Sequence, residues 1–212
     1  MRTDFEVVPL ENRHVPAYRR MLDSWPALPI QAGLEHREFL RRILPQAEDR
    51  YLLAVTPQGA VLGALPTFLA RPPGHPGILN ALPFFGGHGG PYTAKEAPDP
   101  HHVQTALLKA FVELAATQKV AAATLVSSPM DTDVAWFSQV LGSPSQDWRM
   151  GQISTLPQCS GEPETADELL MAGFHQKTRN AVRKGLKGGY RLRLGGSDCD
   201  FEALRILHAA NM

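Results

Sequence analysis

The chain has 212 residues, of which 43% are hydrophobic and 20% are charged, and its formal net charge is zero. This composition is ordinary for a folded globular protein and excludes a disordered or fibrous chain. The first residues do not form a signal peptide, and no run of about 18 apolar residues occurs, so we expect a cytoplasmic protein without membrane insertion.

Neither a disulfide framework nor a metal site is predicted. The two cysteines, Cys159 and Cys199, are 40 residues apart and have no Cys-x-x-Cys or Cys/His neighbours. His75, His101 and His102 lie among Pro and Gly without the helical spacing of metal ligands. We therefore expect free thiols, surface histidines and no bound metal.

The N-terminal elements are predicted to be a strand and two helices. Residues 2–10 alternate enough in hydrophobicity for a short strand. A helical stretch that Pro16 interrupts runs to Trp25, and residues 34–44 repeat the helical pattern until Pro45 ends it.

A hairpin and a helix packed on a sheet are predicted next. Residues 50–70 contain two apolar runs separated by residues 56–59, where Pro and Gly favour the backbone angles of a tight turn. A third apolar run covers residues 78–85. Residues 101–118 place apolar side chains at helical spacing, and the short run 120–126 suits a buried strand.

The C-terminal half continues the alternation of helices and strands. The remaining predicted elements are a helix at 131–141, a strand at 148–156, a linker at 157–164, a helix at 165–187, a strand at 190–194 and a helix at 200–212. Strands that first pair as hairpins and are then joined through helices indicate an α/β protein, with a mixed sheet flanked by helices.

Basic residues are concentrated in one segment. Residues 1–168 contain 13 Lys and Arg against 18 Asp and Glu, whereas residues 169–197 contain seven basic residues and no acidic one. Such a segment on an otherwise acidic chain implies a local anionic partner more than a general affinity for nucleic acid.

A glycine-rich segment, residues 86–90, is the first candidate site. Glycines allow backbone amides to approach an anion or a substrate closely, so Gly87, Gly89 and Gly90 are candidate substrate-lining residues. His88 could act as a general base on an attacking amine, and Tyr92 could orient the substrate. The alternative is that the glycines only turn the chain, His88 is exposed to solvent and Tyr92 packs in the core.

The second candidate site is the basic helix. Arg179, Arg183 and Lys187 follow one another at i, i+4 and i+8 and share a face, and Lys177 precedes them. Four cations on such a helix could clamp the phosphates of a nucleotide-linked substrate. The alternative is a solvated helix face opposite the acidic side chains of the N-terminal segment.

Two segments carry a family resemblance. Residues 82–91, LPFFGGHGGP, and residues 177–193, which begin KTRNAVRKGLKGG, resemble in order the corresponding motifs of FemAB-like proteins. The resemblance implies a GNAT-like domain at 1–160, a linker and basic interdomain helix at 161–189, and the start of a second GNAT-like domain at 190–212. On this resemblance we expect the chain to be the N-terminal part of a longer protein.

The same resemblance implies an N-acyltransferase or aminoacyltransferase. The donor would be acyl-CoA or aminoacyl-tRNA, and the acceptor an amine on a peptidoglycan precursor or a small molecule. No Gln/Arg-x-x-Gly-x-Gly/Ala loop, which binds the CoA pyrophosphate in ordinary GNAT domains, precedes a helix in this chain. Two alternatives stay open: a non-catalytic module that binds RNA or another polyanion through the basic helix, and a homodimer formed through residues 190–212. In the enzyme interpretation, the glycine-rich segment and the basic helix lie close together around an anionic substrate.

Overall fold

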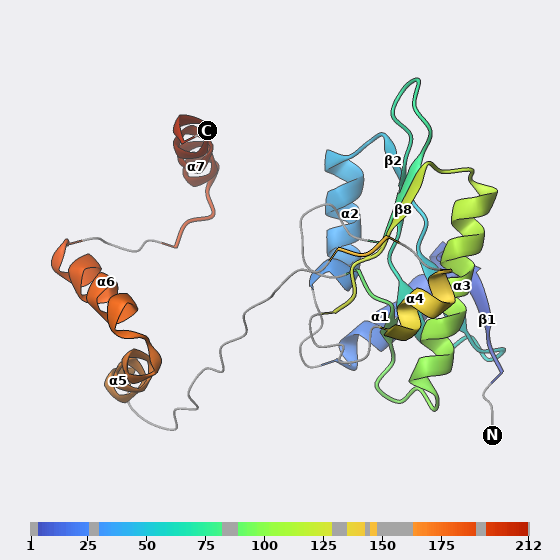
Figure 1. Cartoon of the computed structure of the whole chain (residues 1–212), viewed down its shortest axis with the longest axis horizontal. Helices are drawn as coiled ribbons and strands as arrows, with labels where there is room; N and C mark the ends of the chain where they lie inside the picture. The colour runs from blue at the N-terminus through green and yellow to red at the C-terminus, as the bar shows by residue number, and fades with distance from the viewer. Residues whose placement is uncertain are drawn as a thin grey trace. The chain divides into compact units, whose positions relative to one another are not determined.

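A computed structural model of the chain describes residues 4–25, 30–81, 89–128, 135–142, 145–147, 163–189 and 194–211. The chain divides into two units, Met1–Gly151 and Gln152–Met212. The described elements of the first unit (Figure 1) are β1 (Glu6–Pro9), η1 (Asn12–His14), α1 (Val15–Asp23), η2 (Ile30–Ala32), α2 (Leu34–Ile43), β2 (Ala47–Asp49), β3 (Leu52–Val55), β4 (Val61–Leu65), β5 (Phe68–Ala70), β6 (Ile78–Asn80), β7 (Tyr92–Thr93), α3 (Pro100–Thr117), β8 (Ala122–Thr124) and α4 (Ala135–Leu141). Those of the second unit are α5 (Pro163–Gly173), α6 (Gln176–Lys187) and α7 (Asp198–Ala210).

A long bent hairpin joins the two sheets of the first unit. One sheet has the strand order β1-β3-β4-β7 and the other has the order β2-β5-β6-β8. The chain passes from β2 directly into β3, and from β4 directly into β5, so each arm of the hairpin belongs to both sheets. The backbone N–H of Arg50 donates to the carbonyl of Thr67 at 2.7 Å, which keeps the two arms together at the bend.

The tip of this hairpin is the predicted turn. The N–H of Thr56 donates to the carbonyl of Ala60 at 2.9 Å, and Gly59 has a φ of +81°. That backbone conformation is strained for a residue with a side chain, so glycine at this position allows the turn to close. The predicted hairpin is confirmed.

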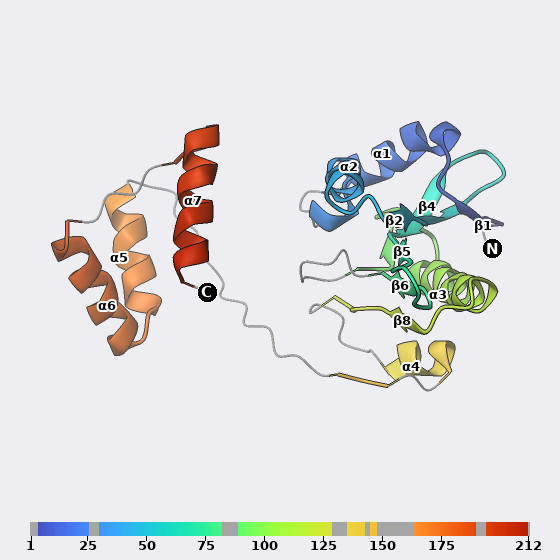
Figure 2. The same cartoon turned by 90° about the horizontal axis from the view of Figure 1, so that it is seen from above.

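Helices cover both faces of the sheets. Helices α1 and α2 lie on one face, and α3 and α4 lie on the other (Figure 2). The two cores follow the alternation of side chains along β3. Tyr51, Leu53 and Val55 face α1 and α2, whereas Leu52 and Ala54 face α3. The α/β architecture with helices on a mixed sheet is confirmed, since β6 and β8 are parallel and the other strand pairs are antiparallel.

Helix α3 packs very closely on the sheet. A Cβ atom at Gly63 would lie 2.6 Å from Cγ1 of Val103 and 2.8 Å from the backbone oxygen of Tyr92. Glycine at this position therefore permits the close approach of α3 to β4. The predicted helix at 101–118 is confirmed as α3, whose first turn is capped by the Asp99 carboxylate, which accepts from the N–H of His102 at 3.0 Å.

Two details of the predicted elements are wrong. Pro16 does not interrupt a helix, because it lies in the first turn of α1, where its missing N–H costs no hydrogen bond. The run 120–126 forms a strand, β8, but its side chains are exposed. Since β8 is an edge strand that pairs only with β6 among the described strands, one of its sides lacks a neighbouring strand.

The second unit differs from the prediction of one helix at 165–187. Two helices, α5 and α6, replace it, and the chain leaves the helical conformation between them. His175 has extended backbone angles, and its Nδ1 accepts from the N–H of Lys177 at 3.3 Å, so it acts as the N-cap of α6. Gly173 ends α5, in keeping with the weak helix propensity of glycine.

Several predictions cannot be compared with the structure. The predicted strand at 148–156, the linker at 157–162 and residues 190–193 of the predicted strand at 190–194 lie outside the described residues. The predicted C-terminal helix is present as α7. The assignment of α6 as an interdomain helix and of residues 190–212 as the start of a second domain stay predictions.

Candidate functional site

An interruption in strand pairing marks the candidate site of the first unit. Phe68 of β5 pairs with Asn80 of β6, and Ala64 of β4 pairs with Tyr92 of β7. Residues 65–67 of one arm therefore lie opposite the much longer segment 81–91. That segment must leave the sheet between β6 and β7, which places it beside the bend of the hairpin.

The same segment starts at the carboxyl end of a parallel strand pair. β6 and β8 run in the same direction, with Asn80 opposite Thr124, and helix α3 lies between them in the chain. The N–H of Ala81 continues this pairing by donating to the carbonyl of Thr124 at 2.8 Å. Ligands of open α/β sheets bind outside the carboxyl ends of parallel strands, so segment 81–91 stands where a substrate is expected.

The described glycines of this segment have structural duties. The N–H of Gly89 donates to the carbonyl of Val126 at 2.9 Å, so this amide is not available to an anion. Gly90 has a φ of +98°, and a Cβ atom there would lie 3.1 Å from the ring of Tyr92. Both glycines therefore shape the return of the chain to the sheet. Gly87 and His88 lie outside the described residues, and their predicted roles stay predictions.

Tyr92 lies inside the first unit and not on its surface. It pairs with Ala64, a member of the core beneath α1 and α2, and its side chain is buried. Burial raises its pKa above that of an ordinary tyrosine, so the hydroxyl is protonated at neutral pH. A role for Tyr92 in orienting a substrate stays a prediction.

Two further tyrosines, Tyr18 and Tyr51, belong to the same core. Their rings meet edge to face, with centroids 6.4 Å apart. The hydroxyl of Tyr18 donates to the carbonyl of Ala32 at 2.7 Å. The hydroxyl of Tyr51 is buried as well, but it has no hydrogen-bond partner among the residues that the structure describes.

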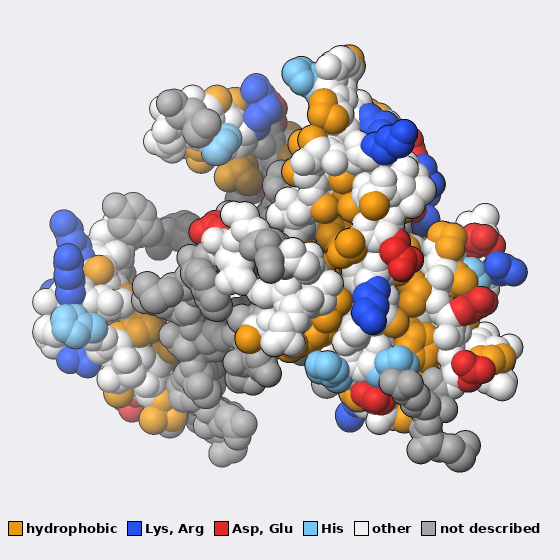
Figure 3. Space-filling model, turned by 45° about the vertical axis from the view of Figure 1, so that its right-hand side comes forward, with side chains coloured by type: hydrophobic (Ala, Val, Ile, Leu, Met, Phe, Trp, Pro, Cys, Tyr) orange, Lys and Arg blue, Asp and Glu red, His pale blue; other side chains and the backbone are white. Residues whose placement is uncertain are grey.

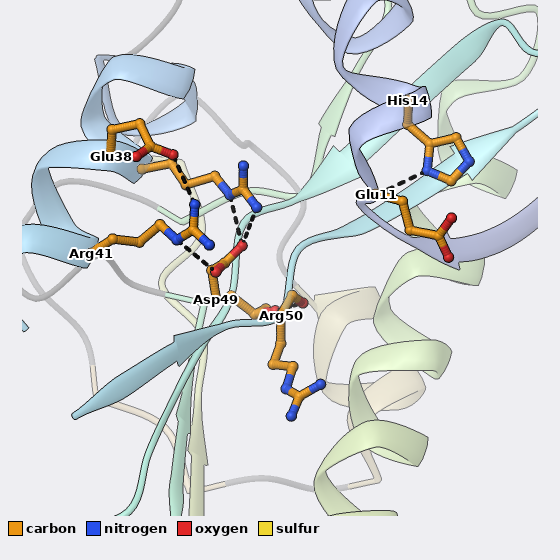
Figure 4. A network of polar contacts seen from close by, with 8 residues as sticks. Glu11, His14, Glu38, Arg41, Asp49 and Arg50 are labelled. Carbon is orange, nitrogen blue, oxygen red and sulfur yellow. Dashed lines mark hydrogen bonds and ion pairs between the residues drawn. The ribbon is translucent and has the colours of Figure 1, made fainter. Parts of the chain in front are cut away.

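An ionic network joins α2 to β2 beside Tyr51 (Figure 4). Nε of Arg37 donates to Oδ2 of Asp49 at 2.7 Å, and Nε of Arg41 lies 3.2 Å from Oδ1 of the same carboxylate. Glu38 pairs in turn with Arg41. The guanidinium of Arg37 also lies over the ring of Tyr51, 5.6 Å from its centroid. Asp49 is therefore held by two cations, one of which stacks on Tyr51.

The sequence indicated none of these roles for Tyr51, Arg37 and Asp49. Tyr51 begins an apolar run, as core tyrosines do, and Arg37 lies on a helix with several other charged residues. The only local signal is a polar aromatic residue in a strand that is otherwise aliphatic.

The predicted basic site lies on α6 in the second unit. Lys177, Arg183, Lys184 and Lys187 are exposed, and no acidic side chain in the described ranges pairs with them. On the face shown in Figure 3, by contrast, basic and acidic side chains of the first unit lie interspersed. The unpaired cations of α6 are thus available to an anionic ligand.

Arg179 is different from the other cations of α6. Its Nη1 donates to the carbonyl of Phe174 at 2.7 Å and to that of Ala172 at 3.4 Å, and its Nη2 donates to Oε1 of Gln176 at 2.8 Å. It therefore satisfies backbone carbonyls at the end of α5, in the manner of a basic C-capping side chain. A phosphate would have to compete with these contacts.

The candidate residues fall into both units. The structure brings Gly89, Gly90 and Tyr92 together in the first unit and the basic residues together in the second. Their predicted proximity to each other stays a prediction. No group of His, Cys, Asp and Glu that could hold a metal ion is found among the described residues. In the described segments, no helix has both the length and the apolar composition of a membrane span.

Comparison with known proteins finds similarity in structure only. The sequence matches no protein-family model and no curated protein. Solved structures similar to this chain include an acetyltransferase from Trypanosoma brucei, with a TM-score of 0.46 and 13% identity over 71% of this chain and 100% of that one. A protein from Pyrococcus furiosus that is provisionally named an acetyl transferase has a TM-score of 0.45 and 17% identity over 71% of this chain and 100% of that one. A probable acetyltransferase has a TM-score of 0.41 and 18% identity over 75% of this chain and 100% of that one.

Proposed function

We propose that this chain is a cytoplasmic N-acyltransferase of the GNAT type, in the FemAB-like branch, that transfers an acyl or aminoacyl group to an amine. The observation that carries the proposal is the interruption of strand pairing at residues 81–91, at the carboxyl end of the parallel strands β6 and β8. This is the place in an α/β sheet where a substrate can contact main-chain groups that no neighbouring strand uses.

The unpaired cations of α6 support an anionic donor. Acyl-CoA and aminoacyl-tRNA both carry phosphates, and Lys177, Arg183, Lys184 and Lys187 would hold them by charge-assisted hydrogen bonds. Arg179 would contribute less, because its guanidinium already binds the carbonyls at the end of α5. The Gly89 amide is also engaged, so the phosphates depend on side chains more than on a glycine loop.

The reaction needs no covalent intermediate on the protein. The lone pair of the acceptor amine attacks the carbonyl carbon of the donor thioester or ester, and the carbon–sulfur or carbon–oxygen bond then breaks. The amine loses a proton, and the departing thiolate or alkoxide gains one. The protein must hold the two substrates in line, take up the proton and stabilise the oxyanion. His88 is the proposed base because an imidazole titrates near neutral pH.

The experiment is a transfer assay with the full chain. The purified protein is incubated with acetyl-CoA or with aminoacyl-tRNA and a panel of amines, and the products are identified by mass spectrometry. We expect transfer from one donor, with the KM for that donor raised by about tenfold or more in the double variant Arg183→Ala/Lys187→Ala. Lys109→Ala, which removes an exposed cation from α3, is the matched control and leaves the KM unchanged.

Two results would count against the enzyme. Neither donor may bind or react with any amine, which refutes acyl transfer by this chain. Alternatively, RNA binding that depends on salt and is lost in Arg183→Ala/Lys187→Ala, without any transfer, supports the non-catalytic module.

A further inference from the structure

The buried hydroxyl of Tyr51 is the least explained polar group of the first unit. Tyr51 is 1% exposed, and its hydroxyl oxygen has no hydrogen-bond partner among the described residues. A buried hydroxyl that makes no hydrogen bond lowers the stability of the folded state. Phenylalanine would fill the same space without this cost, so the hydroxyl calls for a reason other than packing.

Tyr18 offers a matched comparison in the same core. Its ring meets that of Tyr51 edge to face, and it is also completely buried. Its hydroxyl, however, donates to the carbonyl of Ala32 at 2.7 Å. One of these two hydroxyls therefore stabilises the fold, and the other does not.

Tyr51 stands where the strand pairing is interrupted. Leu52 pairs with Leu65, and the N–H of Arg50 donates to the carbonyl of Thr67, so Tyr51 lies opposite Pro66. Residues 65–67 are the ones that face segment 81–91 on their other side. Tyr51 thus lies at the bend of the hairpin, one strand away from the point where segment 81–91 leaves the sheet.

Tyr92 borders the other end of the interruption. It pairs with Ala64, which belongs to the same core as Tyr51 and Tyr18, so its side chain lies on the same face of the sheet. The hydroxyls of Tyr18, Tyr51 and Tyr92 are near enough for the pKa of Tyr18 to be raised by the other two, after the larger effect of burial. Polar groups therefore gather on this face of the sheet beside the interruption.

The charges near Tyr51 favour a ligand oxygen. Burial raises the pKa of Tyr51 most, and among the charged neighbours Arg37 lowers this pKa more than Asp49 raises it. The guanidinium of Arg37, 5.6 Å from the ring centroid, thus leaves a positive potential at the hydroxyl. A group with a lone pair or a negative charge suits this position, and an ammonium group does not.

We propose that the Tyr51 hydroxyl donates a hydrogen bond to a carbonyl or carboxylate oxygen of the acceptor, whose class is therefore an amino acid or a peptide. This inference rests on the proposed function, since it assigns the acceptor of that reaction. The amine that reacts and the oxygen that Tyr51 binds belong to the same molecule. An amine without a neighbouring carbonyl group lacks the second contact.

Binding by wild type, Tyr51→Phe and Tyr18→Phe tests the proposal without relying on catalysis. The probes are a panel of amino-acid amides, and each is paired with the simple amine that lacks the carboxamide, such as alaninamide with isopropylamine. Thermal unfolding of the full chain is followed with increasing probe, and the dissociation constant is obtained from the rise in Tm. The free variants are compared in the same way.

Three results are expected together. Without a probe, Tyr51→Phe unfolds at the wild-type Tm or above it, whereas Tyr18→Phe unfolds below it. At least one amide stabilises the wild type, and its affinity falls by about ten- to a hundredfold in Tyr51→Phe, as for a hydrogen bond to a polar or charged ligand group. The paired simple amine binds wild type and Tyr51→Phe equally.

Any of three other results would overturn the proposal. No amide stabilises the wild type; an amide binds Tyr51→Phe as well as the wild type; or Tyr51→Phe loses as much Tm as Tyr18→Phe, which shows that the hydroxyl has a structural partner. Failure of the proposed function is a separate outcome. In that case an amide binds through Tyr51, but neither acetyl-CoA nor aminoacyl-tRNA acylates it.

Discussion

Removal of the Asp49 carboxylate tests the ionic network between α2 and β2. Asp49 and Arg37 expose only 15% and 12% of their side chains, and Asp49 is the described carboxylate that pairs with Arg37. Asp49→Ala leaves the guanidinium of Arg37 largely buried without a counter-charge. Loss of one partner of a buried pair costs about 3–5 kcal/mol, and partial exposure reduces this to about 2–3 kcal/mol.

The assay is urea unfolding followed by tryptophan fluorescence. All three tryptophans belong to the first unit, so their fluorescence reports on that unit alone. Thermal unfolding of a unit of this size shifts by about 2–4 °C for each kcal/mol, so we expect Tm to fall by about 4–12 °C in Asp49→Ala.

A neighbouring ion pair supplies the control. Glu48 pairs with Arg50, but the two side chains are 56% and 42% exposed, so Glu48→Ala should cost less than about 0.5 kcal/mol. The double variant Arg37→Leu/Asp49→Leu should recover part of the loss, because neither buried charge remains. If Asp49→Ala is as stable as Glu48→Ala, the reasoning about the buried pair is refuted.

Three more predictions concern packing, capping and pH. Gly63→Ala should destabilise the first unit by about 1–3 kcal/mol, because the new Cβ atom would overlap Val103 and the β7 backbone; an unchanged urea midpoint would contradict this close packing. Arg179→Ala should accelerate amide hydrogen exchange at the junction of α5 and α6, whereas Arg183→Ala should not; equal exchange in both would remove the capping role of Arg179. Burial lowers the pKa of His36, so the folded chain binds a proton there less readily than the unfolded chain, and stability should fall as the pH drops below about 6.5. That fall should be smaller in His36→Gln, and identical pH profiles would contradict the assignment.

The elements predicted correctly are those that local sequence decides. The helices α2 and α3 follow from apolar side chains at helical spacing, and α3 also has an N-cap and a proline in its first turn. The hairpin of β3 and β4 follows from two apolar runs around a Pro and Gly turn. Interactions within a few residues of one another determine these segments, so a single sequence contains the signal.

The candidate site could be predicted only in part. The glycines at 89 and 90 marked an unusual segment, but the hydrogen bond from Gly89 to Val126 joins residues distant in the chain. The basic residues of α6 were also evident, but the capping contacts of Arg179 depend on the break after α5, which the helical pattern did not reveal.

The amino-acid sequence by itself determined the α/β class, the positions of most helices and strands, and the concentration of cations in one segment. Only the tertiary structure decided that one hairpin bends into two sheets, that strand pairing is interrupted beside residues 65–67, and that the Tyr51 hydroxyl is buried without a described partner while that of Tyr18 is bonded. The physical reason is that periodicity and turn chemistry act over a few residues. Strand register, the satisfaction of buried hydroxyls and the pairing of charges arise from contacts between segments far apart in the chain.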